Sequence, residues 1–94
     1  MFEARHGANG EILLIGRLDL SQVEALREAL KAVETSCELN FSGVDYISSA
    51  CLGVLLGLQR RLVEKGQTLT LTQMSRHMRE LFTIAGFSQV FVIK

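Results

Sequence analysis

Residues 40–55 read NFSGVDYISSACLGVL, and this stretch decides the fold. Apolar residues alternate up to Phe41, a turn follows at Gly43, and an apolar helical pattern begins directly after two adjacent serines, Ser48 and Ser49. This order predicts a strand, a loop and a helix whose first turn carries a hydroxyl group. Because a helix N-terminus favours anions, such a serine either caps the helix or carries a phosphate.

The sequence on both sides of this stretch alternates between strand-like and helix-like patterns. Strands are predicted at residues 2–6, 11–16, 37–41, 68–72 and 90–93. Helices are predicted at residues 21–33, 49–65 and 75–85. The order β-β-α-β-α-β-α-β predicts a single small α/β domain over residues 1–94. Its sheet is expected to be mainly parallel but mixed, with right-handed crossovers and an antiparallel N-terminal strand.

Local motifs predict how the first elements begin and how they are covered. Asn9-Gly10 predicts a hairpin turn between the first two strands. Ser21, followed three residues later by Glu24, predicts a capping box at the start of the first helix. The continuous apolar run at residues 12–15 is typical of a strand that is covered on both faces.

Three glycines near the serines have predicted structural roles. Gly43 is interpreted as a turn residue, because no phosphate-loop pattern follows it. Gly53 and Gly57 lie on one face of the predicted helix and indicate close packing against the sheet or a neighbouring helix. Apolar residues nearly encircle the first turns of this helix: Leu52, Val54, Leu55, Leu56 and Leu58. Such a helix is either unusually buried or partly reserved for a partner.

Charge and composition argue against several classes of partner. The 94 residues include ten basic and ten acidic side chains without a basic stripe, so we expect no nucleic-acid partner. The apolar stretches are too short for membrane insertion, and the charged residues 1–6 do not form a signal peptide. Two cysteines without an export signal indicate reduced thiols in a cytoplasmic protein. We expect a monomer or a weak dimer.

Polar residues are predicted to gather near the serines, at the C-terminal edge of the sheet. Asp19 follows the second strand and Asn40 lies near the end of the third, and loops at this edge commonly form sites. Simpler roles remain open: Asp19 as a solvated or capping carboxylate, one serine as a cap, and Cys51 as a small buried hydrophobe. No cysteine or histidine has metal-binding or catalytic spacing, so neither an enzyme activity, a metal nor a cofactor is predicted.

Three segments together resemble the STAS domain of bacterial anti-sigma-factor antagonists. They are Gly16-Arg17-Leu18-Asp19, residues 44–55 and residues 81–87 (LFTIAGF), and the resemblance covers nearly the whole chain. In that family the central segment reads roughly Asp-Ser-Ser/Ala-Gly-Leu-Gly. The serine after the aspartate is phosphorylated by a partner that is both anti-sigma factor and serine kinase. Alignment on Leu52-Gly53 places this phosphoacceptor at Ser49.

The resemblance implies a partner-switching function. The unmodified protein would bind the anti-sigma factor, phosphorylation of Ser49 would release it, and a serine phosphatase would restore binding. The residues expected to contact the partner are Asp19, which matches the family's loop aspartate, and Asn40, Ser48, Cys51 and Leu52. Ser48 stands where the family has aspartate, and Cys51 where it has glycine. A second hypothesis stays open: a constitutive, unphosphorylated STAS binding module of a lipid or anion transporter or of a signalling scaffold.

Overall fold

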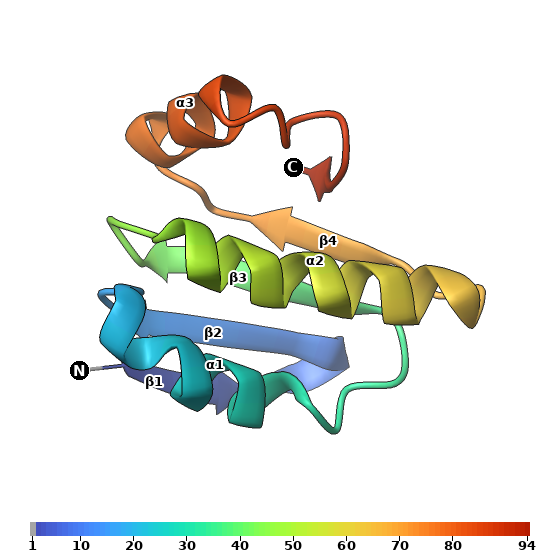
Figure 1. The fold of residues 1–94 in the computed structure, drawn as a ribbon. Helices are drawn as coiled ribbons and strands as arrows, with labels where there is room; N and C mark the ends of the chain where they lie inside the picture. Colours follow the sequence, from blue (N-terminus) through green and yellow to red (C-terminus); the bar gives the residue numbers. More distant parts are fainter. Residues whose placement is uncertain (1) are drawn as a thin grey trace.

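The computed structural model describes residues 2–94, and the five strands of this range form one mixed sheet in the order β1-β2-β3-β4-β5 (Figure 1). The strands are β1 (Phe2–His6), β2 (Glu11–Gly16), β3 (Cys37–Gly43), β4 (Leu69–Thr72) and β5 (Val92–Ile93). β1 pairs antiparallel with β2, and every other pair is parallel. The predicted element order and sheet type are confirmed.

The α-helices of the described range cover one face of this sheet. They are α1 (Val23–Leu30), α2 (Ser49–Glu64) and α3 (Arg76–Ile84). Each helix joins two adjacent parallel strands, and the chain always advances across the sheet in the same direction. Right-handed crossovers that advance in one direction place all helices on the same face. Accordingly, α1 and α2 lie over the same side of the sheet in Figure 1, and Phe82 of α3 packs edge-on against Phe41 of β3.

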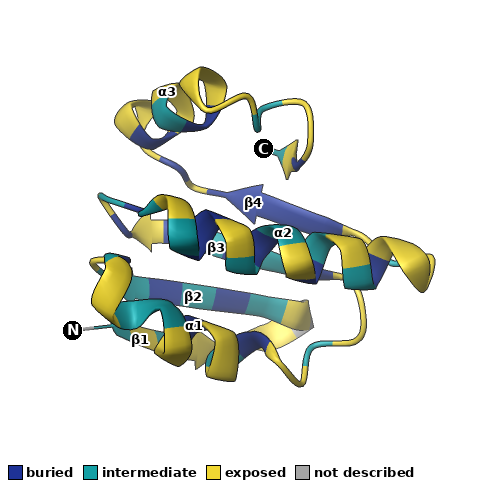
Figure 2. Cartoon of the chain, viewed as in Figure 1, coloured by how far each residue is buried: buried dark blue, intermediate teal, exposed yellow. Residues whose placement is uncertain are grey.

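The hydrophobic core fills the space between the helices and this face of the sheet, and Figure 2 shows the buried stripes on the helices. Fully buried leucines come from the loop after β2 and from β2, β3, β4, α1 and α2: Leu18, Leu14, Leu39, Leu69, Leu71, Leu26, Leu30, Leu55, Leu58 and Leu62. On β2, burial alternates, so Leu13 and Ile15 remain half-exposed on the other face. The prediction that residues 12–15 form a strand covered on both faces is therefore wrong, because no helix of the described range covers the second face.

The beginnings and ends of the elements follow local hydrogen bonding. The predicted hairpin forms through a 3₁₀ turn, η1 (Ala8–Gly10), with Gly10 at φ 77°. The first helix differs from the prediction, because a 3₁₀ turn, η2 (Leu20–Gln22), precedes α1 and is capped by Asp19 instead of Ser21. α2 stops as predicted at Gly66, which has φ 72°, while the N–H of Gln67 donates to the Leu62 carbonyl at 2.8 Å.

One predicted glycine role is confirmed and another is wrong. Gly43 lies in a turn, in which the Val44 N–H donates to the Phe41 carbonyl at 3.0 Å. A Cβ atom on Gly43 would lie 2.9 Å from the Leu14 carbonyl oxygen, so this glycine permits close approach of β3 to the irregular part of β2. Gly53 and Gly57 instead face open space: a Cβ atom on either would meet nothing within 4 Å. The close packing predicted for these two positions does not exist within the described chain.

Candidate functional site

The N-terminus of α2 is fixed by Ser48. Its Oγ accepts a hydrogen bond from the Cys51 N–H at 3.2 Å, and its own N–H donates to the Leu18 carbonyl at 2.8 Å. Its extended backbone, with φ −82° and ψ 161°, is that of an N-cap residue. Ser48 is therefore the serine that caps the helix, and its hydroxyl is already engaged in the fold.

Ser49 occupies the first helical position and its side chain is exposed. The amides of Ser49 and Ala50 belong to the first turn, where no intrahelical acceptor exists. The first turn contains no acidic residue, and α2 is 16 residues long. The helix end can therefore stabilise negative charge at Ser49 without displacing a core side chain.

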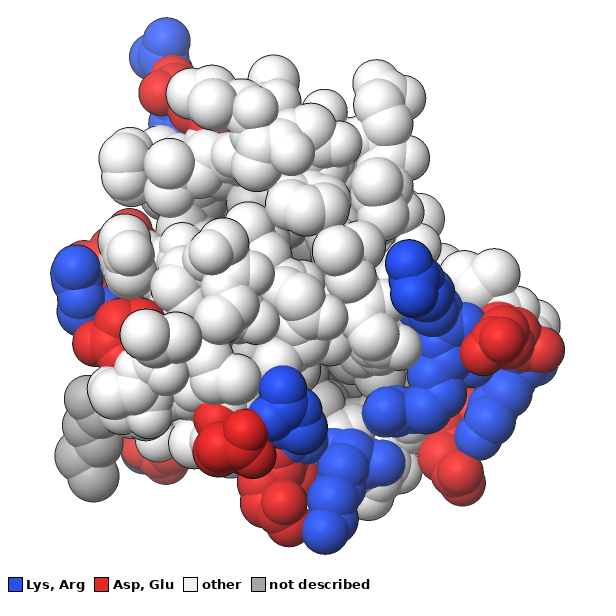
Figure 3. Space-filling model, viewed as in Figure 1, with Lys and Arg blue, Asp and Glu red and all other residues white. Residues whose placement is uncertain are grey.

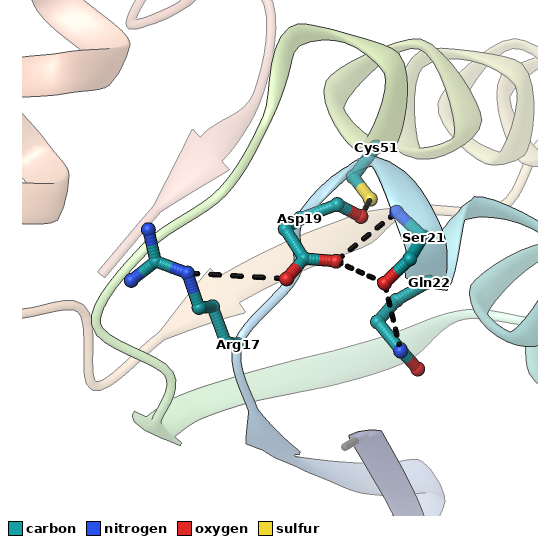
Figure 4. A network of polar contacts seen from close by, with 5 residues as sticks. All are labelled: Arg17, Asp19, Ser21, Gln22 and Cys51. Atoms are coloured by element: carbon teal, nitrogen blue, oxygen red, sulfur yellow. Dashed lines mark hydrogen bonds and ion pairs between the residues drawn. The ribbon is translucent and has the colours of Figure 1, made fainter.

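Asp19 lies in the loop after β2 at the centre of a polar network (Figure 4). Its Oδ1 accepts hydrogen bonds from the Ser21 N–H at 3.0 Å and from the Ser21 hydroxyl at 2.5 Å. Arg17 approaches the other carboxylate oxygen, at 3.9 Å from Nε to Oδ2, and stacks 4.1 Å above the Tyr46 ring. The hydrogen bonds from Ser21, with a smaller contribution from the positive charge of Arg17, lower the pKa of Asp19. Asp19 is thus a fixed, ionised carboxylate.

Backbone contacts join the Asp19 loop to the serines. Leu18 forms a parallel bridge with Ile47, and its N–H donates to the Tyr46 carbonyl at 3.2 Å. The thiol of Cys51, in the first turn of α2, donates to the Asp19 carbonyl at 3.5 Å. The structure therefore brings the aspartate loop and the N-terminus of α2 together at the C-terminal edge of the sheet.

Asn40 does not belong to this group. Its register partners are Leu13 and Thr72, which lie on the sheet face opposite the helices, because the neighbouring Leu39 and Phe41 fill the core. Its side chain donates to Glu11 Oε2 at 3.2 Å and accepts from the Ser42 N–H at 2.9 Å. The strand alternation thus directs Asn40 away from Ser49, which corrects its predicted place beside the serines.

Two further predicted contact residues are buried. The exposed fraction of Cys51 is 0% and that of Leu52 is 7%, because both side chains face the core beneath α2. This burial revises the expectation that they contact a partner directly, and their observed role is to pack the first turn of the helix. By contrast, Leu20 follows Asp19 directly and is 73% exposed. Sequence reasoning missed Leu20, whose only signal is an apolar residue in a polar loop.

The surface around Ser49 is poor in charge. Figure 3 shows no Lys, Arg, Asp or Glu over the N-terminal half of α2, whereas charged side chains gather along α1 and the C-terminal end of α2. Within residues 2–94, no helix is both long enough and apolar enough to span a bilayer. An exposed serine and an exposed leucine, with the ionised Asp19 beside the uncharged surface of α2, are suited to binding another protein.

The chain is similar in sequence to proteins named as anti-sigma factor antagonists. A protein of Bordetella bronchiseptica named as the anti-sigma factor antagonist BtrV is 32% identical over 81 residues, which cover 85% of this chain and 70% of that protein. The anti-sigma-B factor antagonist of Listeria monocytogenes is 27% identical over 88 residues, or 89% of this chain and 77% of that protein.

Solved structures share the fold. The phosphorylated form of the Bacillus cell fate determinant SpoIIAA has a TM-score of 0.69 at 24% identity, covering 100% of this chain and 91% of that one. A sulfate transporter family protein from Wolinella succinogenes has a TM-score of 0.69 at 16% identity, covering 95% and 80%. The family model described as "Mlab, STAS domain" matches residues 1–93. The chain therefore belongs to the STAS domain family.

Proposed function

We propose that this protein is an anti-sigma-factor antagonist that switches partners through phosphorylation of Ser49. In the unmodified state it binds an anti-sigma factor that is also a serine kinase. Phosphate transfer to Ser49 ends that binding, and a serine phosphatase restores it. The chain itself is a binding protein in this scheme, because both chemical steps belong to its partners.

The observation that supports this proposal is the position of Ser49. Its side chain is exposed at the first position of α2, and Ser48 is the residue that caps the helix. A phosphate there adds a charge of about −1.5 to −2 and three acceptor oxygens at a helix end that favours anions. Folding is therefore expected to tolerate the modification.

The same charge explains the release of a partner. A surface that binds the uncharged face around Ser49 excludes water from it, and burying a phosphate without a matched cation is costly. Asp19 adds a second negative charge near the N-terminus of α2, since its carbonyl contacts Cys51 in the first turn. A partner that engages the Asp19 carboxylate through a cation would meet a changed electrostatic surface after phosphorylation.

Phosphoryl transfer by the partner kinase tests the proposal directly. The chain is incubated with the kinase, ATP and a divalent metal, and any phosphate is mapped by mass spectrometry while complex formation is followed by size-exclusion chromatography. Phosphate on Ser49 together with release of the kinase supports the switch. A kinase complex that persists with fully phosphorylated Ser49 would contradict it. Ser49→Ala serves as the control, and should bind the kinase without accepting phosphate.

A constitutive binding role is the second candidate. It is favoured by Ser48, which occupies the position of the family aspartate and whose hydroxyl is bound to the Cys51 N–H. The family model's description and the similarity in fold to a sulfate transporter family protein fit a transporter-associated module. A stable complex with a transporter subunit, equally strong for wild type and Ser49→Asp, would favour this function over the switch.

A further inference from the structure

The glycines of α2 have no explanation inside the molecule. Gly53 and Gly57 are exposed in the interior of the helix, and a Cβ atom on either would meet nothing within 4 Å. Glycine weakens a helix interior relative to alanine, because the free chain loses more conformational entropy and no side chain packs. Alanine would fit both positions, so the fold itself gives no reason for glycine.

These glycines form part of a groove between α1 and α2. The groove has a volume of about 360 Å³. Its residues come from the facing sides of both helices and include two buried leucines at its floor: Arg27, Leu30, Lys31, Ala50, Gly53, Val54, Gly57, Leu58 and Arg61. Ala50, Gly53 and Gly57 recur at helical spacing, so for about two turns one row of the α2 side has almost no side-chain bulk, beside the larger Val54 and Leu58. Such a surface allows the backbone of another helix to approach closely.

The groove has an uncharged end and a cationic end. Ala50, directly after Ser49, belongs to the uncharged end, and the groove therefore continues the surface described around the serines. At the other end lie Arg27, Lys31 and Arg61, and no carboxylate lines the groove. The groove lining is therefore basic, while the carboxylates that pair with two of these cations, Glu24 and Glu28, lie outside it on α1.

The three cations differ in their partners. Arg27 pairs with Glu24 and Lys31 with Glu28 along the exposed side of α1. Exposed pairs of this kind contribute little to stability, so these cations can exchange their carboxylates for those of another protein. Arg61 donates to the carbonyls of Leu30 and Val33 at 2.8 and 3.0 Å, and its buried Nε has no acceptor among the described residues.

We propose that one α-helix of the partner kinase lies in the groove between α1 and α2. The segment of this helix beside Ala50 and Gly53 carries small apolar side chains, and the segment beside Lys31 and Arg61 carries carboxylates. The proposal rests on the proposed function, since the occupant is the partner that Ser49 controls. It adds a binding surface that extends two turns beyond the phosphorylation site.

The experiment uses recombinant serine-kinase anti-sigma factors encoded in the genome of the source organism, with affinity measured by calorimetry. Gly57→Leu adds bulk to the groove at a position where a Cβ atom meets nothing within 4 Å. We expect the free variant to be at least as thermally stable as wild type, and its melting temperature is measured alongside the affinity. We expect this variant to bind the kinase at least tenfold more weakly than wild type. Val63→Phe adds similar bulk to an exposed position outside the groove and should leave the affinity unchanged.

A second pair of variants tests the acidic character of the occupant. Lys31→Glu should weaken binding and reduce its dependence on salt concentration. Arg5→Glu, on the sheet face opposite the helices, should change neither. Unchanged affinity in Lys31→Glu would overturn the acidic occupant.

The outcomes separate this proposal from the proposed function. Wild-type affinity in Gly57→Leu, with Ser49 still phosphorylated by the bound kinase, would overturn the groove and leave the switch standing. If no kinase binds or phosphorylates the wild-type chain, the proposed function fails and the groove proposal fails with it.

Discussion

The thiol of Cys51 donates to the backbone carbonyl of Asp19 at 3.5 Å. This contact ties the first turn of α2 to the loop that carries the aspartate, and the fully buried Cys51 side chain also packs in the core. The fold therefore holds the N-terminus of α2, where the proposed phosphoacceptor Ser49 lies, in a fixed relation to Asp19.

Cys51→Ala should lower the free energy of unfolding by about 1–2 kcal/mol, because it removes a buried atom and leaves a small cavity. Urea unfolding followed by circular dichroism measures the change. Ser49→Ala is the matched control, because Ser49 is exposed and lies two residues before Cys51 in the same helical turn. Removal of its hydroxyl should alter the free energy of unfolding by no more than about 0.5 kcal/mol. Equal stability of Cys51→Ala and wild type would show that this contact is unimportant.

Two glycines should respond to alanine in opposite directions. Gly57→Ala should stabilise the protein by about 0.5–1 kcal/mol, because the new methyl group meets no neighbour and alanine has a higher helix propensity than glycine. Gly43→Ala should destabilise it, because the Cβ atom would lie 2.9 Å from the Leu14 carbonyl oxygen. Thermal unfolding of both variants provides the measurement. A destabilised Gly57→Ala protein would contradict the open groove.

The pKa of Asp19 should depend on Ser21. The hydrogen bonds from Ser21 are the largest cause of the lowered pKa, so in Ser21→Ala the pKa should rise towards the ordinary value of aspartate. Carboxyl ¹³C chemical shifts measured through an acid titration report the change. Because the folded-state pKa is lowered, the stabilisation from the ionised form is present above the unfolded pKa. It is lost as the pH falls through the folded pKa.

An unchanged titration of Asp19 in Ser21→Ala would show that another group controls this carboxylate. Arg17→Gln is the companion variant, since the charge of Arg17 is a smaller contribution than the hydrogen bonds from Ser21. Its effect on the pKa of Asp19 should be in the same direction and smaller.

Arg61 should contribute to stability by joining two helices. Its guanidinium donates to the carbonyl of Leu30, the last residue of α1, and to that of Val33 just after the helix, where carbonyls lack intrahelical partners. Arg61→Met should cost about 1.5–3 kcal/mol, the range for hydrogen bonds from a charged group. The exposed neighbour Arg60 offers the control: Arg60→Met should stay within about 0.5 kcal/mol of wild type in urea unfolding. Similar losses in both variants would argue against the specific role of Arg61.

Much of the fold could be predicted because the spacing of apolar residues agrees with the serines and glycines that mark the ends of helices. Cys37, Leu39 and Phe41 alternate into the core as expected, and Ser75 and Gly66 mark a helix start and a helix end. The one-sided covering of the sheet was not predicted from the apolar run at residues 12–15. It follows from strand order, because successive crossovers in one direction leave the second face without helices.

The features of the candidate site that depend on local sequence could be predicted. The features that depend on which way a side chain points could not. Ser48 as a cap and Ser49 as an exposed neighbour follow from positions around a helix start. The direction of Asn40 and the burial of Cys51 depend on which side of each element faces the core. Gly53 and Gly57 show the same limit, because their spacing fits close packing and an open groove equally well.

In the proposed switch, phosphate on Ser49 controls partner binding. The most direct measurement is the dissociation constant of the partner kinase for the unmodified chain and for the chain phosphorylated at Ser49, under the same salt conditions. We predict binding at least tenfold weaker after phosphorylation, which corresponds to about 1.4 kcal/mol. Equal dissociation constants for the two forms would contradict the account.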